Sequence, residues 1–168
     1  MEKFYQRNLH LIRQHHLDKI CISITKITPY LTALLYAITL FILFISHSSK
    51  LMMTIIKPLS SFLIVTIIRK IYNRPRPCVT FDIEPLVDHK TDESFPSRHT
   101  VSAFAIGFAL LNINTYLGII ALIIACLVGF SRIICAVHFV SDVLCGFLIA
   151  FIICLLYTSD AADDRISV

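Results

Sequence analysis

A histidine and an aspartate near the C-terminus are spaced for acid–base or nucleophilic chemistry. His138 and Asp142 lie four residues apart in the segment Ser131 to Asp142, which also contains Arg132. On a helix, this spacing puts both side chains on one face. A carboxylate bonded to one imidazole nitrogen fixes the tautomer and leaves the other nitrogen as the reactive atom. The pair therefore indicates a catalytic histidine, and a purely structural His–Asp pair is the alternative.

A second candidate is the turn from Ser94 to His99, directly before a long uncharged run. The N–H groups and the positive dipole end of a helix that starts here would favour a bound anion. Ser97 can donate its hydroxyl to that anion, and His99 is positioned to exchange protons with it. The alternative is an N-cap serine followed by a histidine at the membrane interface.

A third candidate is the basic segment Arg69 to Pro77, which contains Arg69, Lys70, Arg74 and Arg76. The planar fork of arginine matches pairs of phosphate oxygens. A basic cluster that only contacts the membrane surface is the alternative.

Long apolar segments must position these three motifs. The chain is 57% hydrophobic and 15% charged, and its mean hydropathy is +0.78. Three stretches contain no Asp, Glu, Lys or Arg: Ile27 to Ser49, Thr100 to Phe130 and Val143 to Ser159. Because about 20 helical residues cross a bilayer core, the sequence predicts an all-α integral membrane bundle.

We expect about five spans. Thr100 to Phe130 is too long for one helix, and Asn112, Asn114 and Gly118 divide it into two helices joined by a tight turn. The other three predicted spans are Pro29 to His47, Leu51 to Ile68 and His138 to Tyr157.

The two ends of the chain differ from this core. Met1 to Lys26 mixes apolar and basic residues, which predicts an amphipathic helix at the membrane surface; a solvated helix packed on the protein is the alternative. Residues 1–157 are interpreted as one membrane domain. Residues 158–168 change abruptly to an Asp-, Ala- and Ser-containing composition, and we interpret them as a solvated end or as sequence foreign to the native reading frame.

Taken together, the three motifs resemble those of the type 2 phosphatidic acid phosphatase superfamily. That signature reads Lys-x6-Arg-Pro, then Pro-Ser-Gly-His, then Ser-Arg-x5-His-x3-Asp. The third element matches without exception from Ser131 to Asp142. In the second element Arg98 replaces the glycine, and in the first element Arg69 stands where lysine is expected.

The resemblance implies a metal-independent lipid phosphatase or diphosphatase with a phosphohistidine intermediate and no cofactor. It assigns His138 as the nucleophile, Asp142 as the residue that orients it, and His99 as the acid and then the base. The phosphoryl oxygens would be held by Arg69, Arg76, Ser97 and Arg132, together with the backbone N–H of Arg98. Lys70 and Arg74 would assist electrostatically.

Other functions fit the sequence less well. A net charge of +4 is too small to indicate a nucleic-acid partner. His89, His99, His138 and Asp142 show no recognised metal-ligand spacing. The expected partner is a lipid phosphate in the membrane, with phosphatidate, phosphatidylglycerophosphate and undecaprenyl diphosphate as candidates. A non-catalytic membrane protein that binds lipid phosphates is the alternative.

Two arguments about orientation conflict. The basic N-terminal segment favours a cytoplasmic N-terminus, which would put the site inside the cell. Bacterial members of the family usually present the site to the outside. Since the catalytic cations should not be counted as topology signals, we expect a bacterial cell-membrane protein with an extracytoplasmic site.

Overall fold

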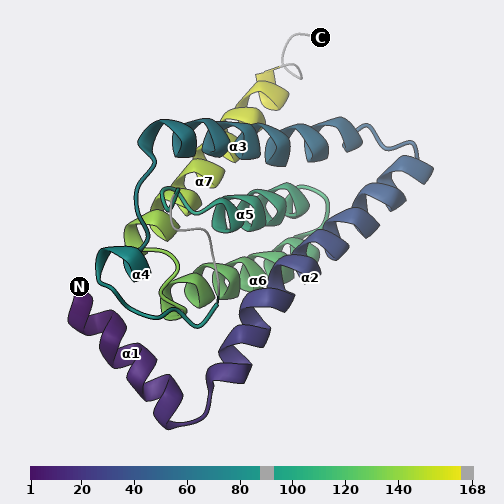
Figure 1. Cartoon of the computed structure of the whole chain (residues 1–168). Helices are drawn as coiled ribbons and strands as arrows, with labels where there is room; N and C mark the ends of the chain where they lie inside the picture. Colours follow the sequence, from purple (N-terminus) through teal and green to yellow (C-terminus); the bar gives the residue numbers. More distant parts are fainter. Residues whose placement is uncertain (88–92, 164–168) are drawn as a thin grey trace.

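The computed structural model describes residues 1–87 and 93–163, and of residues 158–163 it describes only the backbone. These residues form helices and no strands, so the predicted all-α fold is confirmed (Figure 1). The helices are α1 Glu2–Gln14, α2 Asp18–Ile45, α3 Leu51–Tyr72, α4 Pro77–Thr80, α5 Arg98–Leu111, α6 Thr115–Ile134 and α7 Val140–Asp163.

Five of these helices build the membrane bundle. The segments of α2, α3, α6 and α7 are long and apolar enough to cross a bilayer. The fifth, α5, has only 14 residues, about 21 Å at the usual helical rise. It packs against each of the other four, and most of its residues are buried. Because α5 is enclosed by protein rather than lipid, it does not need the full length of a bilayer span.

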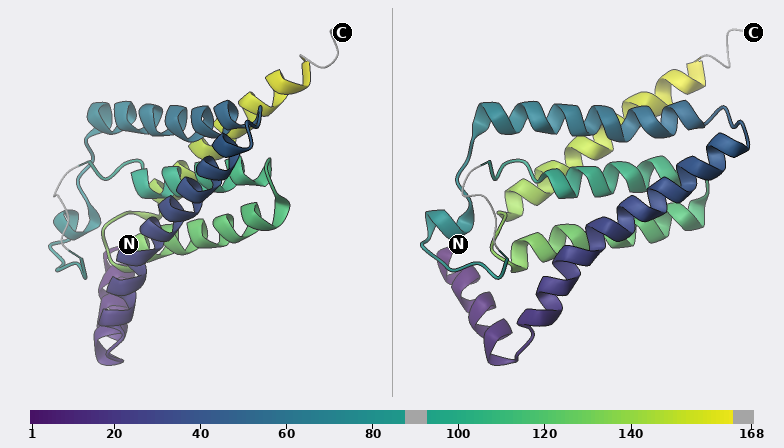
Figure 2. Two further views of the ribbon diagram at one scale, coloured as in Figure 1. Left: turned by 90° about the vertical axis from the view of Figure 1, so that its right-hand side faces the viewer. Right: turned by 45° about the vertical axis from the view of Figure 1, so that its right-hand side comes forward.

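The motif-bearing ends of the helices gather at one end of the bundle. Figures 1 and 2 show the C-terminal ends of α3 and α6 beside the N-terminal ends of α5 and α7. At the opposite end, the α2–α3 turn meets the α5–α6 turn, where Lys50 Nζ donates to the carbonyl of Asn112 at 3.0 Å. The three motifs therefore share one end of the bundle.

The N-terminal amphipathic helix is shorter than predicted. It ends at Gln14, and residues 18–26 instead belong to α2, which has 28 residues. The predicted boundary was wrong because the basic residues of 18–26 extend a spanning helix into the interface instead of forming a separate surface helix. The buried face of α1 packs Tyr5 and Leu9 against Ala136 and Phe139, directly under the third motif.

The predicted break in the long uncharged run is confirmed between Leu111 and Thr115. The side chain of Asn114 caps α6 by accepting a hydrogen bond from Leu117 N at 3.0 Å. Gly118, however, lies inside α6, where a Cβ would come within 2.5 Å of the Leu111 Cα. This glycine is needed for the close approach of α5 and α6 rather than for the turn itself.

The last helix differs from its prediction at both ends. It begins at Val140, so His138 lies in the preceding loop and does not open the span. Its C-terminal end continues to Asp163, six residues beyond the predicted boundary at residue 157. Asp142 is therefore in the first turn of α7, while His138 is presented to it from the loop.

Candidate active site

Asp142 is the residue on which the site converges. Its carboxylate is 0% exposed, and its Oδ2 accepts hydrogen bonds from the Ser94 hydroxyl and, at 2.8 Å, from Phe139 N. The latter contact resembles a capping box, in which a side chain in the first turn satisfies the N–H of the N-cap residue. The same Oδ2 lies 3.4 Å from Nδ1 of His138. A buried carboxylate is stable only when its oxygens are satisfied in this way.

His138 has a buried imidazole, whose Nδ1 faces the carboxylate of Asp142. Its side chain is 2% exposed, and its carbonyl accepts a hydrogen bond from the Tyr5 hydroxyl at 3.2 Å. Burial, with a smaller contribution from the positive charges of Arg76 and Arg69, lowers the pKa of His138 to about 4, against the raising effect of Asp142. At neutral pH the ring is uncharged, and Nε2 is the nitrogen left for chemistry.

Tyr5 supports this loop as a permanent donor. Burial raises the pKa of its phenol to about 12, so the hydroxyl stays protonated at physiological pH. Its ring packs edge-on against Phe139, with ring centroids 6.2 Å apart. The first helix therefore fixes the backbone of the loop that carries His138.

Arg74 contacts the carboxylate of Asp142. Its Nη1 lies 3.1 Å from Oδ1 of Asp142 and 3.0 Å from Oγ of Ser141, and its guanidinium stacks 4.0 Å from the centre of the Phe139 ring. Arg74, which the sequence predicts to assist electrostatically, therefore lies in contact with Asp142.

Three buried arginines surround the loop. Each of them donates a hydrogen bond from a terminal guanidinium nitrogen to a main-chain carbonyl. The acceptors are Pro96 for Arg69 at 2.9 Å, Val137 for Arg76 at 2.8 Å and Thr25 for Arg132 at 3.1 Å. An arginine has five N–H donors in a rigid fork. One such hydrogen bond fixes the orientation of the guanidinium, and the other N–H groups can bind further acceptors. The Nε atoms of Arg69 and Arg76 are buried and have no hydrogen-bond partner among the described residues. Burying cations this way is costly unless they bind an anion.

The start of α5 completes the anion-binding geometry. Ser97 precedes the helix and is fully buried, and its N–H donates to the carbonyl of Asp142 at 3.0 Å. Its Oγ accepts a hydrogen bond from the Thr100 hydroxyl at 2.9 Å. The hydroxyl proton of Ser97 is therefore available for donation to a bound anion. The first-turn N–H groups of a helix lack intrahelical acceptors, which suits this position to a phosphate.

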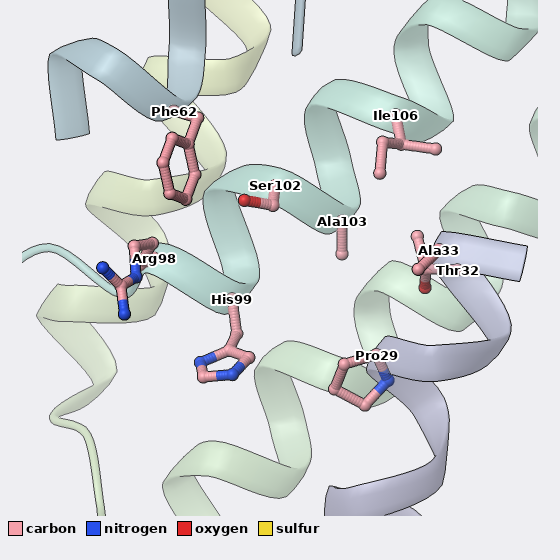
Figure 3. Close-up of a pocket in the computed structure, with 9 residues that line it drawn as sticks. All are labelled: Pro29, Thr32, Ala33, Phe62, Arg98, His99, Ser102, Ala103 and Ile106. Carbon is pink, nitrogen blue, oxygen red and sulfur yellow. The ribbon is translucent and has the colours of Figure 1, made fainter. Parts of the chain in front are cut away.

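The side chains of Arg98 and His99 project from the first turn of α5 and line one side of a pocket. The pocket has a volume of about 220 Å³ and lies between α2, α3 and α5. Figure 3 shows His99 facing Pro29 across it, with Arg98 below Phe62. Its remaining lining is formed by Thr32, Ala33, Ser102, Ala103 and Ile106. Two basic side chains thus border a pocket that is otherwise mainly apolar.

Lys70 is not brought into this arrangement. Its side chain is exposed, and it makes no side-chain hydrogen bond or ion pair with residues 1–87 or 93–157. Its neighbour Arg69 faces inward and forms an ion pair with Glu93 at 3.6 Å. Successive helical positions point about 100° apart, so a cation one residue late in the motif faces away from the site.

Sequence reasoning missed the roles of Ser94 and Tyr5. Ser94 is part of the second motif and was given no role there, yet its hydroxyl donates a hydrogen bond to the Asp142 carboxylate. Tyr5 was counted only among the apolar residues of an amphipathic segment. A tyrosine on the apolar face of a helix is a weak signal for a buried donor. Neither contact has a local sequence pattern, because Ser94 and Tyr5 are 48 and 133 residues from their partners.

Within the part of the chain that the structure describes, no group of three or more His, Cys, Asp or Glu side chains is arranged to hold a metal ion. His89, weighed above as a metal ligand, lies outside the described residues.

Comparison with known proteins gives a consistent result. Residues 30–165 match the PAP2 superfamily. Undecaprenyl-diphosphatase BcrC from Bacillus subtilis (strain 168) is 41% identical over 91 residues, which cover 54% of this chain and 47% of that protein. Phosphatidylglycerophosphatase B from the same organism is 31% identical over 169 residues, covering 93% of this chain and 80% of that protein.

The fold is similar to a solved structure as well. The crystal structure of the first transmembrane PAP2 type phosphatidylglycerolphosphate phosphatase from Bacillus subtilis superposes with a TM-score of 0.71 and 28% identity, covering 99% of this chain and 85% of that chain. The match to BcrC spans about half of that protein's length. The resemblance inferred from the three motifs is confirmed.

The burial of His138 predicts an unusual titration. Its imidazole should stay neutral down to about pH 4, measured by NMR of the protein labelled at histidine, with His138→Ala identifying the signal. Because the pKa is lower in the folded chain than in the unfolded one, the unfolded chain binds the proton first. This contribution to stability is complete above about pH 6.5 and is lost as the pH falls toward 4. A midpoint near 6.5 would contradict the buried, neutral state.

Proposed function

The chain belongs to the PAP2 superfamily, and on that premise we propose that it is a membrane lipid-phosphate phosphatase that acts without a metal ion through a phosphohistidine intermediate. The observation that carries the proposal is the buried His138, whose Nδ1 lies 3.4 Å from Oδ2 of Asp142, with Arg76 donating a hydrogen bond to the carbonyl of the preceding residue, Val137. A nucleophilic histidine needs its reactive nitrogen unprotonated and its ring fixed, and both conditions are met.

In the first step, Nε2 of His138 attacks phosphorus and the P–O bond to the lipid breaks. The electron pair of that bond goes to the leaving oxygen, which takes a proton from His99. The positive charge that develops on the His138 ring is stabilised by Asp142 through Nδ1. Ser94 and Arg74 hold the carboxylate in place during this step.

In the second step, His99 takes a proton from water while the water oxygen attacks phosphorus. The P–N bond breaks, its electron pair returns to His138, and inorganic phosphate leaves. His99 serves first as the acid and then as the base, because it has given up its proton in the first step and can accept one in the second.

The negative charge of the phosphoryl group is matched by fixed donors. Arg69, Arg76 and Arg132 supply the positive charge, while Ser97 and the α5 N-terminus supply neutral donors. Groups that are already oriented stabilise a transition state without having to reorganise. Three arginines can meet this demand, which supports a reaction that needs no metal ion.

The substrate we propose is a lipid phosphate, because the site lies at helix ends, where lipid headgroups lie. The relatives described above include an undecaprenyl-diphosphatase and a phosphatidylglycerophosphatase. Those two lipids, together with phosphatidate, are the candidates. A protein that only binds lipid phosphates would have no need for the nucleophile, its partner and the acid–base histidine, all of which are present.

For localisation we propose the bacterial cell membrane with the site on its outer side. The relatives named above are bacterial. The basic residues at the site end of the bundle are explained by phosphate binding, so they do not require that end to be cytoplasmic.

Phosphate release from the three candidate lipids in detergent, with excess chelator, tests the activity. The wild-type protein should release phosphate from at least one of them, and His138→Ala should lower the rate about a thousandfold or more because the nucleophile is lost. His15→Ala is the matched control, since His15 is an exposed residue at the end of α1 and should leave the rate unchanged. Activity that requires added metal, or that survives in His138→Ala, would refute the mechanism.

Orientation can be tested by cysteine labelling in intact cells, in a background that lacks the six native cysteines. Glu84→Cys is exposed near the site, and Ser49→Cys is exposed in the α2–α3 turn at the opposite end. A membrane-impermeant maleimide should label position 84 in intact cells and position 49 only after permeabilisation. The reverse pattern would place the site in the cytoplasm.

A further inference from the structure

Arg98 is the side chain of the site that the proposed mechanism does not use. The family signature has glycine at this position, which provides a backbone N–H and no side chain. Here a guanidinium occupies the start of α5 and is exposed. An exposed cation at the entrance of a phosphate site acts through its charge, so the question is which part of a substrate it meets.

Arg98 lies between the buried arginines of the site and the apolar pocket. On one side are the phosphate-binding arginines, since its charge acts electrostatically on both Arg69 and Arg76. On the other side is the pocket between α2, α3 and α5, where its guanidinium lies 5.7 Å from the centre of the Phe62 ring. This cation–π contact orients the charged group without neutralising it.

His99 determines which part of the substrate enters this pocket. It lines the pocket beside Arg98 (Figure 3), and it is the residue proposed to protonate the leaving oxygen. The leaving group must therefore lie on the His99 side of the phosphorus, next to Arg98. The apolar lining, which includes Pro29, Ala33 and Ile106, is suited to the first carbons of its hydrocarbon chain.

The charge of the leaving group differs between the two substrate classes. A phosphomonoester releases a neutral alcohol, which gains little from a cation. A diphosphate ester releases a lipid monophosphate, whose negative charge increases as the bridging bond breaks. We propose, on the basis of the phosphatase function above, that Arg98 binds the inner phosphate of a lipid diphosphate and makes diphosphates the preferred substrates.

Nε2 of His138 bonds to the outer phosphorus while the bond from that phosphorus to the bridging oxygen breaks. The electron pair stays on the bridging oxygen, which takes a proton from His99 and becomes part of the lipid monophosphate, and Arg98 compensates the remaining negative charge of that phosphate. Water then cleaves the P–N bond with His99 as base, which releases inorganic phosphate and restores the enzyme.

The test compares farnesyl diphosphate with farnesyl monophosphate in detergent, so that only the number of phosphates differs. Arg98→Gly restores the signature residue and keeps the backbone N–H. Loss of one charge-assisted contact should lower kcat/KM for the diphosphate about 10- to 100-fold, against about threefold or less for the monophosphate. Arg98→Lys should recover part of the loss. In the control Lys26→Ala, which removes an exposed cation of α2, the diphosphate-to-monophosphate ratio should match that of the wild-type protein.

A binding measurement separates this proposal from the phosphatase function. In the His138→Ala background, where no turnover is expected, Arg98→Gly should weaken farnesyl diphosphate binding by a comparable factor. Equal binding with and without Arg98, or equal losses of kcat/KM for both substrates, would overturn the proposed role of Arg98. Wild-type protein that binds the diphosphate through Arg98 but releases no phosphate would refute the phosphatase function alone.

Discussion

The site depends on the buried carboxylate of Asp142. One oxygen accepts from Ser94 and Phe139 and faces His138, while the other pairs with Arg74. The main-chain carbonyl of the same residue accepts from the N–H of the serine that precedes α5. A charge with no exposure to water is stable only if these contacts form together. Satisfying this single group therefore fixes the relative positions of all three motifs.

The membrane explains why so many polar groups can meet at one place. Helices that cross a bilayer satisfy their own backbone groups and leave apolar side chains facing lipid, so functional polar residues are restricted to helix ends and to the protein interior. The short α5 is enclosed by its neighbours, and its N-terminus lies at the level of the motifs. The arginines that surround it are buried, and each is held by a main-chain carbonyl. The cost of burying these cations is consistent with a site that receives a phosphate anion.

The sequence predicted the features that follow from local rules. Charge-free runs indicated α2, α5, α6 and α7, while α3 was predicted as an apolar segment that contains Lys57. The spacing of His138 and Asp142 indicated their contact, although His138 lies in a loop rather than on the helix. What could not be predicted were contacts between distant segments. The hydroxyls of Ser94 and Tyr5 reach their partners only after the bundle has assembled, and nothing near them in the sequence indicates those partners. For the same reason, the fixed position of Arg74 on the carboxylate appeared only in the structure.

The central claim is that phosphate is transferred to His138 before it reaches water. The direct measurement is mass spectrometry of protein quenched in alkali during turnover of a lipid diphosphate, using His99→Ala to slow the second step by about 10²–10⁴-fold. The monophosphate that leaves from a diphosphate needs an acid less than an alcohol does, so the first step is slowed less than the second. We expect an acid-labile, base-stable phosphoryl group on the peptide that contains His138, and we expect it to disappear in the double variant His99→Ala, His138→Ala. A phosphoryl group on another residue, or sustained turnover with no phosphorylated protein, would contradict it.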